Sequence, residues 1–146
     1  MSTEENKATA RRLIEEWYKG QEAHMAAYEE LYAPDYVYHG TGVFADLDLA
    51  AMKQMVPAFW TAFPDQHYTL EDLIAEGDKV VCRYTWRATH QGEFMGVPAT
   101  GKVVTYTGII ISRFARGKVV EDWVNADMLG LMQQLGAISQ MAQAGA

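Results

Sequence analysis

The chain has 146 residues, of which 49% are apolar and 21% are charged, and its formal net charge is −7. A chain of this length can bury roughly 68–70% of its unfolded surface, so we expect one domain over residues 1–146. The composition excludes a disordered chain. Most of the negative charge lies in residues 1–50, which argues against nucleic acid as a partner because phosphate groups would be repelled there.

The sequence indicates neither a membrane nor an oxidising compartment. No charged segment followed by an apolar one opens the chain, and no apolar run is long enough to cross a bilayer. The one cysteine, Cys82, cannot form an internal disulfide. We therefore expect a cytoplasmic protein without membrane contact, in which Cys82 is a buried and unreactive thiol.

The first half of the chain and its end show the apolar spacing of helices. The expected helices are residues 3–19, 22–32, 48–63 and 128–141, with a short extended piece at 36–39. Ser2 has the position of an N-cap for the first helix, and Asp46 or Asp48 has that of a cap for the third. Pro57 removes one hydrogen bond inside the third helix, which predicts a kink or a new helix start there.

Between the third and last helices the apolar period changes from 3.6 to 2, which is typical of strands. The expected strands are residues 68–75, 79–90, 102–114 and 118–126. Two turns, at 77–78 and 116–117, and one loop, at 91–101, join these strands as hairpins. Helices followed by strands joined in this way predict an α+β fold with an antiparallel sheet rather than alternating βαβ units. Such a sheet can curl around the helices, and its concave face can then hold a small molecule.

The common cofactor motifs are absent. The chain has no dinucleotide-binding glycine pattern and no hydrolase or metalloprotease signature. Its four histidines lie singly, without a second His or Cys at ligand spacing, so we expect no metal site and no cofactor. Any chemistry would then be proton transfer by histidines and carboxylates in a dry cavity.

Asp122 is the first candidate for proton transfer. It shares its strand face with Val120 and Val124, because side chains alternate between the two faces of a strand. A carboxylate among apolar neighbours has a raised pKa, which suits a general acid or base at neutral pH. The alternative is an edge-strand aspartate that pairs with an exposed Arg or Lys.

His39 and His90 are the other two candidates. His39 ends a short apolar strand, where it either faces a pocket or hydrogen-bonds a neighbouring carbonyl. His90 ends the strand 79–90 on the apolar face of that strand, where it lies either at a cavity rim or in the core. Arg83 lies on the opposite face of the same strand, because side chains alternate between the two faces. Arg83 and His90 therefore cannot both face one cavity unless the strand contains a bulge.

A larger set of side chains could bind the ligand. Aromatic residues suit a flat ligand but are more commonly core, and Asp127 has the position of a helix cap as well as that of a pocket residue. The predicted binding residues are Trp17, Tyr36, Phe59, Trp60, Arg83, Trp86, Tyr106, Ile110, Val124 and Asp127. Arg83 and Tyr106 would polarise a carbonyl group if they turned inward.

Several segments, in this order and spacing, resemble the SnoaL-like polyketide cyclase and ester cyclase family of the nuclear transport factor 2-like (cystatin-like) fold. They are residues 32–36 (YAPDY) before His39, 63–65 (FPD), 75–83 (AEGDKVVCR), 89–98 (THQGEFMGVP), 100–102 (TGK), 117–123 (GKVVEDW), Asp127 and 134–136 (QLG). The resemblance covers nearly the whole chain. It implies a cone-shaped domain with a pocket between helices and sheet, a homodimer, and no metal or organic cofactor.

In the family's characterised cyclases, an aspartate on the last long strand drives an intramolecular aldol closure, with help from pocket histidines. By the resemblance, the position of that aspartate is Val124 in this sequence, and the position of one pocket histidine is Ile110. Asp122 lies two residues before Val124 on the same face and is a candidate for a displaced acid–base group.

These observations predict a small-molecule enzyme with cofactor-free acid–base chemistry, namely cyclisation, isomerisation or dehydration of an apolar carbonyl or polyketide-like compound. Two alternatives remain open. One is a non-catalytic protein that binds an apolar small molecule in the same cone, which Val124 and Ile110 favour. The other is an interaction dimer that uses the outer face of the sheet around Ile109 and Ile111.

Overall fold

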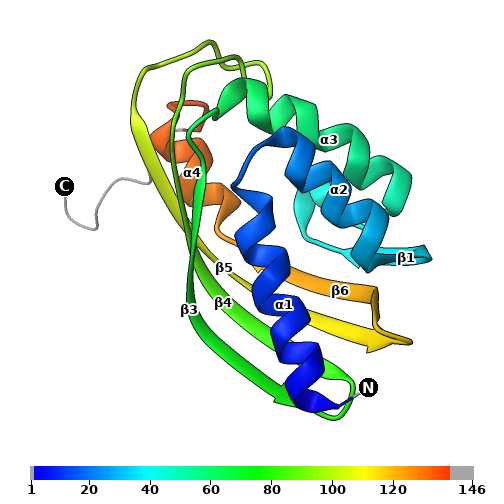
Figure 1. Cartoon of the computed structure of the whole chain (residues 1–146). Helices are drawn as coiled ribbons and strands as arrows, with labels where there is room; N and C mark the ends of the chain where they lie inside the picture. The colour runs from blue at the N-terminus through cyan, green and yellow to red at the C-terminus, as the bar shows by residue number, and fades with distance from the viewer. Residues whose placement is uncertain (1, 139–146) are drawn as a thin grey trace.

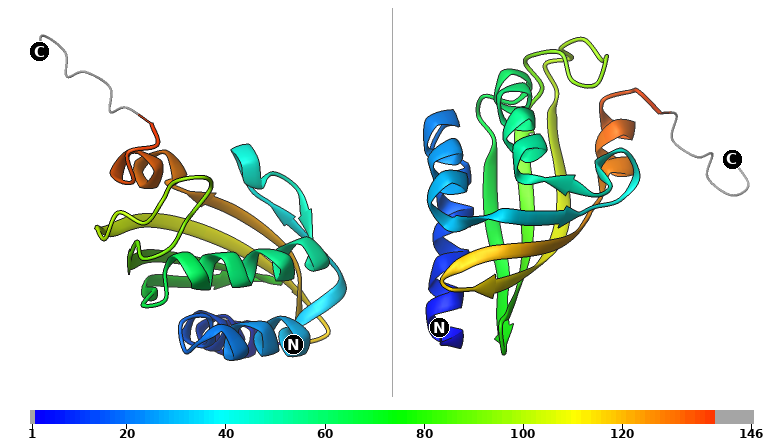
Figure 2. Two further views of the ribbon diagram at one scale, coloured as in Figure 1. Left: turned by 90° about the horizontal axis from the view of Figure 1, so that it is seen from above. Right: turned by 90° about the vertical axis from the view of Figure 1, so that its right-hand side faces the viewer.

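The computed structural model describes residues 2–138. Its elements are α1 (Thr3–Trp17), α2 (Gln21–Leu31), β1 (Tyr32–His39), the 3-10 helix η1 (Gly42–Phe44), β2 (Leu47–Asp48), α3 (Leu49–Ala62), β3 (His67–Glu76), β4 (Lys79–Thr89), β5 (Val103–Ala115), β6 (Lys118–Ala126) and α4 (Met128–Gln134). The expected α+β class is confirmed. The curved sheet lies behind α1, α2 and α3, which cover one of its faces (Figure 1; Figure 2).

Side-chain caps begin three of the helices. The Ser2 hydroxyl accepts a hydrogen bond from the Glu5 amide at 3.1 Å, and this cap begins α1. Asp48, rather than Asp46, caps α3, because its carboxylate accepts from the Ala51 amide at 2.8 Å. Each cap satisfies an amide of the first turn, which has no partner within the helix.

The sheet has the strand order β2-β1-β6-β5-β4-β3. Every neighbouring pair is antiparallel except β1–β6, which is parallel, so the sheet is mixed rather than wholly antiparallel. Tight turns join β3 to β4 and β5 to β6, and the longer loop 90–102 joins β4 to β5, so these strands pair antiparallel in chain order. No such turn joins β1 to β6, because most of the fold separates them along the chain.

Of the two expectations at Pro57, a new helix start is wrong, because α3 runs through Pro57 as one helix. The last helix also differs from the sequence-based expectation. α4 ends at Gln134 rather than near residue 141, because Gly136 has a φ of 81°, a left-handed conformation that ends helices. Ile138 is exposed, and residues 139–141 lie outside the described part of the chain.

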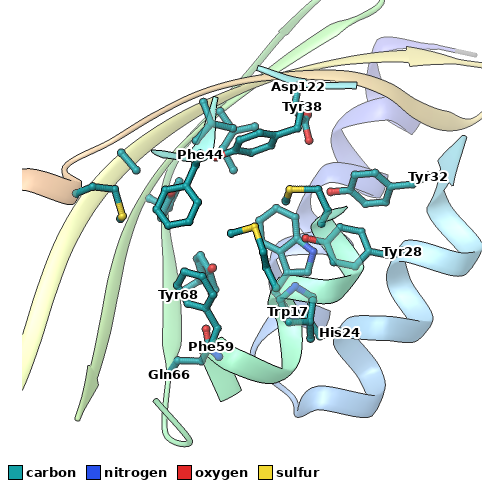
Figure 3. A pocket seen from close by; sticks show the side chains of 18 of the residues that line it. Trp17, His24, Tyr28, Tyr32, Tyr38, Phe44, Phe59, Gln66, Tyr68 and Asp122 are labelled. Atoms are coloured by element: carbon teal, nitrogen blue, oxygen red, sulfur yellow. The ribbon is translucent and has the colours of Figure 1, made fainter. Parts of the chain in front are cut away.

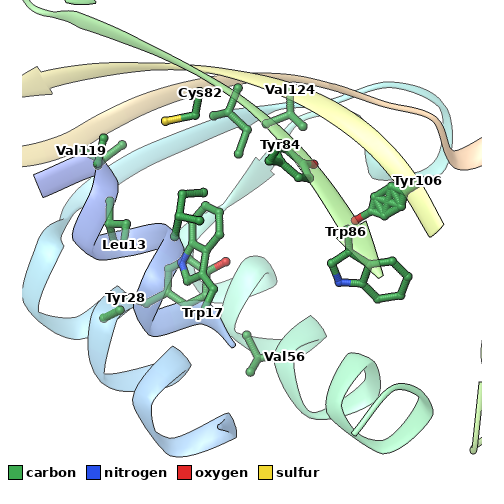
Figure 4. Close-up of a cluster of buried hydrophobic side chains, with 14 of the residues drawn as sticks. Leu13, Trp17, Tyr28, Val56, Cys82, Tyr84, Trp86, Tyr106, Val119 and Val124 are labelled. Atoms are coloured by element: carbon green, nitrogen blue, oxygen red, sulfur yellow. The ribbon is translucent and has the colours of Figure 1, made fainter. Parts of the chain in front are cut away.

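The core lies between the helices and the inner face of the sheet (Figure 4). On β4, Cys82, Tyr84 and Trp86 are buried, whereas the residues between them point outward. Gly108 lies opposite Tyr84 on β5, and a Cβ at that position would collide with the Tyr84 ring. The glycine therefore makes room for an aromatic side chain on the inner face.

Among residues 2–138, no helix is both long enough and apolar enough to span a membrane.

Candidate active site

A cavity of about 120 Å³ lies between the helices and the inner face of the sheet (Figure 3). A single water needs only about 10–15 Å³ by a comparable measure, so the cavity has room for an organic molecule. Aromatic and apolar side chains from α1, α2, α3 and every strand from β1 to β6 except β2 line most of it. The lining residues include every tyrosine of the chain except Tyr18, namely Tyr28, Tyr32, Tyr36, Tyr38, Tyr68, Tyr84 and Tyr106.

Asp122 is the carboxylate of this pocket. It lies on β6 with only 3% of its surface exposed, and in Figure 3 it is seen beside Tyr38 at one end of the pocket. One oxygen, Oδ2, accepts a hydrogen bond from the Tyr36 hydroxyl at 2.7 Å. The other, Oδ1, accepts from the Ser112 hydroxyl at 2.5 Å. Ser112 lies directly opposite Asp122 on β5, whereas Tyr36 lies on β1 two residues before Tyr38, the residue in register with Asp122.

The environment of Asp122 favours its neutral form. Burial raises the pKa of Asp122 from 3.8 to about 6, although the hydrogen bonds from Ser112 and Tyr36 oppose part of this rise. Desolvation penalises the carboxylate, and hydroxyl donors stabilise it. A group with a pKa near 6 can both accept and return a proton at neutral pH, as a general acid–base group must.

The tyrosines around Asp122 stay protonated. Burial, followed by the charge of Asp122, raises the pKa of Tyr28, Tyr32, Tyr36 and Tyr38, and that of Tyr38 reaches about 12. At neutral pH each is therefore a hydrogen-bond donor. The pocket thus combines one titrating carboxylate with several neutral hydroxyls.

His24 on α2 also lines the pocket. Burial lowers the pKa of His24 to about 4, so the ring is neutral at pH 7. Its Nδ1 accepts a hydrogen bond from the indole nitrogen of Trp60 at 3.2 Å. Because an indole N–H only donates, the proton of the neutral His24 ring is on Nε2.

The structure places seven of the predicted site residues in the pocket lining. They are Trp17, Tyr36, Phe59, Tyr106, Ile110, Asp122 and Val124. Val124 and Ile110, the positions that the resemblance relates to the cyclases' aspartate and histidine, face each other across the β5–β6 pair. The pocket therefore has aliphatic side chains at these two positions, and its carboxylate lies further along β6.

His39 lies outside the pocket, which corrects its expected position. It pairs with Trp123 in the β1–β6 register and stacks on that ring on the outer face of the sheet. Its Nε2 lies 2.6 Å from Glu121 Oε2, and its Nδ1 lies 3.2 Å from Asp46 Oδ1. These carboxylates raise the pKa of His39. The cause is strand alternation, since Tyr36 and Tyr38 point inward and their neighbour His39 must point outward.

His90 is fully buried but does not line the pocket. Its ring packs near Phe63, and its Nδ1 accepts a hydrogen bond from the Thr100 amide at 3.2 Å. The main chain of His90 also bonds to Lys102 and Gly101. In this position His90 holds the two ends of the loop 91–101 together, rather than lying at a cavity rim.

The other predicted binding residues also lie away from the lining. Arg83 points outward and forms an ion pair with Asp72 at 2.6 Å, as its parity opposite to His90 requires. Asp127 caps α4 by accepting from the Gly130 amide at 2.9 Å. Trp60 and Trp86 direct their indole N–H groups at pocket residues instead of lining the pocket themselves.

Sequence reasoning did not identify His24 or Gln66, which both line the pocket. A signal for His24 exists, because it shares the buried face of α2 with Ala27, Tyr28 and Leu31 at helical spacing. Gln66 precedes β3 in a turn, where neither a period of 2 nor one of 3.6 indicates which way a side chain points.

Within residues 2–138, the structure shows no group of three or more His, Cys, Asp or Glu side chains that could hold a metal ion. The pocket therefore offers acid–base chemistry at Asp122, with hydroxyl, imidazole and amide donors around an apolar cavity.

A helix-covered curved sheet with an apolar pocket between its layers is typical of proteins that bind small molecules, and the comparisons identify the family. The family model of the SnoaL-like polyketide cyclases matches residues 8–135, so the chain belongs to this family. No curated protein matches the chain.

Several solved structures are similar to the chain. AclR from Streptomyces galilaeus, a proposed hydroxylase, is 33% identical with a TM-score of 0.83, and the match covers 94% of this chain and 99% of that one. IdmH from Streptomyces antibioticus, a proposed polyketide cyclase, is 31% identical with a TM-score of 0.77 over 90% and 98% of the two chains. A SnoaL-like protein from Jannaschia is 23% identical over 93% and 94% of the chains, with a TM-score of 0.83, which supports the fold.

Proposed function

We propose that this protein is a small-molecule enzyme in which Asp122 transfers a proton to and from an apolar carbonyl compound. The observation that carries this proposal is a buried carboxylate with a pKa of about 6 in an apolar pocket. Membership in the SnoaL-like polyketide cyclase family supports a cyclase-like enzyme, and the choice of Asp122 rests on the geometry alone.

In the proposed step, the ionised Asp122 removes a proton from the carbon next to the carbonyl group. The C–H electron pair becomes the carbon–carbon double bond of an enolate, and the carbonyl oxygen takes the negative charge. Tyrosine hydroxyls in the pocket stabilise that oxygen by donating hydrogen bonds. The protonated Asp122 then returns its proton to the product, so the enzyme ends the cycle unchanged.

This proposal moves the acid–base position relative to the family's cyclases. By the resemblance, the cyclase aspartate corresponds to Val124, whereas in this chain the carboxylate is Asp122 on the same face of β6. Two residues along a strand correspond to about 7 Å, so the reacting carbon would lie nearer to Tyr36 and Ser112. Similar proteins carry both cyclase and hydroxylase names, and we restrict the proposal to proton transfer, which Asp122 itself can perform.

The test uses 2-tetralone, an apolar ketone with acidic α-protons, in D₂O, with the loss of those protons followed by NMR. We expect the wild type to accelerate the exchange, with a rate that rises as pH increases through about 6, because the carboxylate must be ionised to act as base. Asp122→Asn should lower the protein-dependent rate by at least about 100-fold, the usual contribution of a general base.

The matched control is Glu121→Gln, which removes the neighbouring carboxylate on the outer face of β6. We expect this variant to exchange the α-protons of 2-tetralone within twofold of the wild-type rate, roughly the effect expected of a group outside the site. Equal rates for the wild type and Asp122→Asn would contradict the proposed function.

A non-catalytic binding function is the second candidate. It is favoured by the facing aliphatic pair Val124 and Ile110, and by Asp122, both of whose oxygens are already held by hydroxyl groups. This function predicts that 2-tetralone binds in the pocket without any acceleration of exchange. The NMR experiment therefore distinguishes the two candidates, provided that binding is recorded in the same titration.

We also propose that the protein is a homodimer. The exposure of Ile74, Val103 and Ile109 on the outer face of the sheet supports this, since large apolar side chains on one face commonly mark an interface. Light scattering during size-exclusion chromatography measures the mass directly, and a mass of one chain, 16.4 kDa, would contradict the dimer.

A further inference from the structure

Gln66 lines the pocket and carries a buried hydrogen-bond donor that has no partner among the described residues. The residue lies between α3 and β3, lines the cavity, and has only 4% of its surface exposed. In Figure 3 it is seen beside Phe59 and Tyr68, at the opposite end of the pocket from Asp122. Its backbone amide bonds to the Phe63 carbonyl at 3.2 Å, which fixes the point from which the side chain extends.

The orientation of the Gln66 amide follows from its neighbour Trp86. The indole nitrogen of Trp86 donates a hydrogen bond to Gln66 Oε1 at 3.1 Å. Because an indole can only donate, the oxygen of the amide must face Trp86 and the nitrogen must face away. Trp86 is fully buried, so a rotation of the amide would leave its N–H without a partner at a cost of about 1–3 kcal/mol.

The amide nitrogen Nε2 of Gln66 is buried, and no hydrogen-bond partner for it exists within residues 2–138. Most buried polar groups in proteins are paired, so an unpaired amide at a cavity wall indicates a partner that enters the cavity. Such a partner must accept a hydrogen bond, as the oxygen of a carbonyl or hydroxyl group does.

His24 shows the same arrangement at another point of the pocket wall. There the indole of Trp60 occupies the acceptor Nδ1, which leaves the N–H at Nε2 as the donor. The two tryptophans therefore occupy the acceptor atoms of two polar pocket residues, and in each residue the remaining nitrogen is a donor. The lining thus favours a ligand that brings acceptors rather than donors.

Gln66 lies far from the proposed reaction site. Asp122 is in register with Ser112, and Ser112 with Val80 on β4. Trp86, which holds Gln66, lies about 20 Å further along β4 than Val80 at the usual rise per residue, measured along the curved strand. A ligand that reaches both groups must therefore be elongated, with an oxygen remote from the carbon that loses its proton.

We propose that Gln66 determines specificity by binding a carbonyl or hydroxyl oxygen of an elongated apolar substrate, at the end remote from Asp122. The substrate part of this inference rests on the proposed function. The binding part does not, because the Gln66 amide would anchor the same oxygen in a protein that only binds the ligand.

The test compares two probes that share the naphthalene ring and a two-carbon chain, 2-acetylnaphthalene, which has an acceptor oxygen, and 2-ethylnaphthalene, which has none. Calorimetric titration of the full chain should give a dissociation constant about tenfold lower for the ketone, as one good hydrogen bond provides. In Gln66→Met this preference should disappear, while the affinity for 2-ethylnaphthalene stays within twofold.

The matched control is Gln54→Met on α3, which changes an exposed glutamine outside the pocket lining and should leave both affinities unchanged. A second measurement needs no variant. In the wild type, the side-chain NH₂ signals of Gln66 should shift in ¹H–¹⁵N spectra when the ketone is added, and should shift much less with the hydrocarbon.

An equal loss of affinity for both probes in Gln66→Met, or a wild type that does not prefer the ketone, would overturn the proposal. Unresponsive NH₂ signals would do the same. Asp122→Asn should keep the ketone preference, since Asp122 lies at the other end of the pocket. A failure of proton exchange in the 2-tetralone experiment would therefore refute the proposed function without affecting Gln66.

Discussion

Asp122 and Glu121 are neighbours on β6, yet their side chains point to opposite faces of the sheet. Their pKa values are shifted in opposite directions. Burial raises the pKa of Asp122 to about 6, and its partners are the neutral hydroxyls of Ser112 and Tyr36. Glu121 lies on the outer face, where hydrogen bonds with His39 and Arg113 lower its pKa. The comparison shows that the strand face on which a carboxylate lies decides whether it can act as a base near neutral pH.

The largest expected effect on stability concerns Asp122→Asn, which removes the ionisable group from the inner face. The folded-state pKa of Asp122 is raised from 3.8 to about 6, so ionisation destabilises the fold as pH rises through this window. At 1.36 kcal/mol per pKa unit, the cost is about 3 kcal/mol above pH 7. Relative to wild type, Asp122→Asn should gain about that much stability between pH 3 and pH 8.

Urea unfolding at a series of pH values measures this difference, and Glu121→Gln is its counterpart on the outer face. The pKa of Glu121 is lowered, so its contribution is present above the ordinary value of 4.5 and is lost as pH falls through the lowered pKa. Glu121→Gln should therefore be less stable than wild type at neutral pH. If the free energy of unfolding had the same pH dependence in Asp122→Asn and in wild type, burial would not raise the pKa of Asp122, and the contrast between the two faces would be wrong.

The next effect concerns Tyr36→Phe, which removes one hydroxyl donor from the Asp122 carboxylate. That hydrogen bond lowers the pKa of Asp122, so its loss should raise the pKa further above 6. Hydrogen bonds to charged groups contribute about 1.5–3 kcal/mol, which corresponds to a shift of about one pH unit or more. The pH profile of 2-tetralone exchange should move upward by that amount, whereas an unchanged midpoint would show that Tyr36 does not stabilise the carboxylate.

The smallest effect concerns His39→Gln on the outer face. Glu121 and Asp46 raise the pKa of His39, so its stabilisation is present below 6.5 and is lost as pH rises through the raised pKa. The side chain is 34% exposed, and we expect a loss of less than about 1 kcal/mol at pH 6, which salt should reduce further. The exchange rate should not change. A loss of exchange activity would mean that His39 acts on the pocket despite its outward position.

Strand alternation allowed much of the sheet to be predicted from the sequence. The period of 2 placed Asp122 on the same strand face as two valines, and the structure shows that this face is buried. The same period placed Arg83 and His90 on opposite faces. The same rule could have placed His39, because the aromatic residues Tyr36 and Tyr38 at alternate positions indicate an inward face that excludes it. Only four residues of β1 were expected to be extended, and this was too short a segment to decide which face was buried.

Other parts of the site could not be predicted from local sequence patterns. The direction of the Gln66 amide depends on Trp86, which lies on a different strand, and no sequence spacing links the two. The parallel pairing of β1 with β6 likewise joins segments from opposite ends of the chain. Such contacts are set by the three-dimensional fold, whereas helix caps are local: Ser2 was predicted as a cap, and Asp48 was one of two predicted candidates.

The central claim is that Asp122 is a buried carboxylate that titrates near neutral pH. Labelling the protein with [¹³Cγ]-aspartate and following the Asp122 carboxyl signal by NMR from pH 3 to pH 9 tests it directly, with Asp122→Asn identifying the signal. We predict a midpoint near pH 6. A midpoint at or below pH 4 would contradict the account, because Asp122 would then be an ordinary ionised carboxylate.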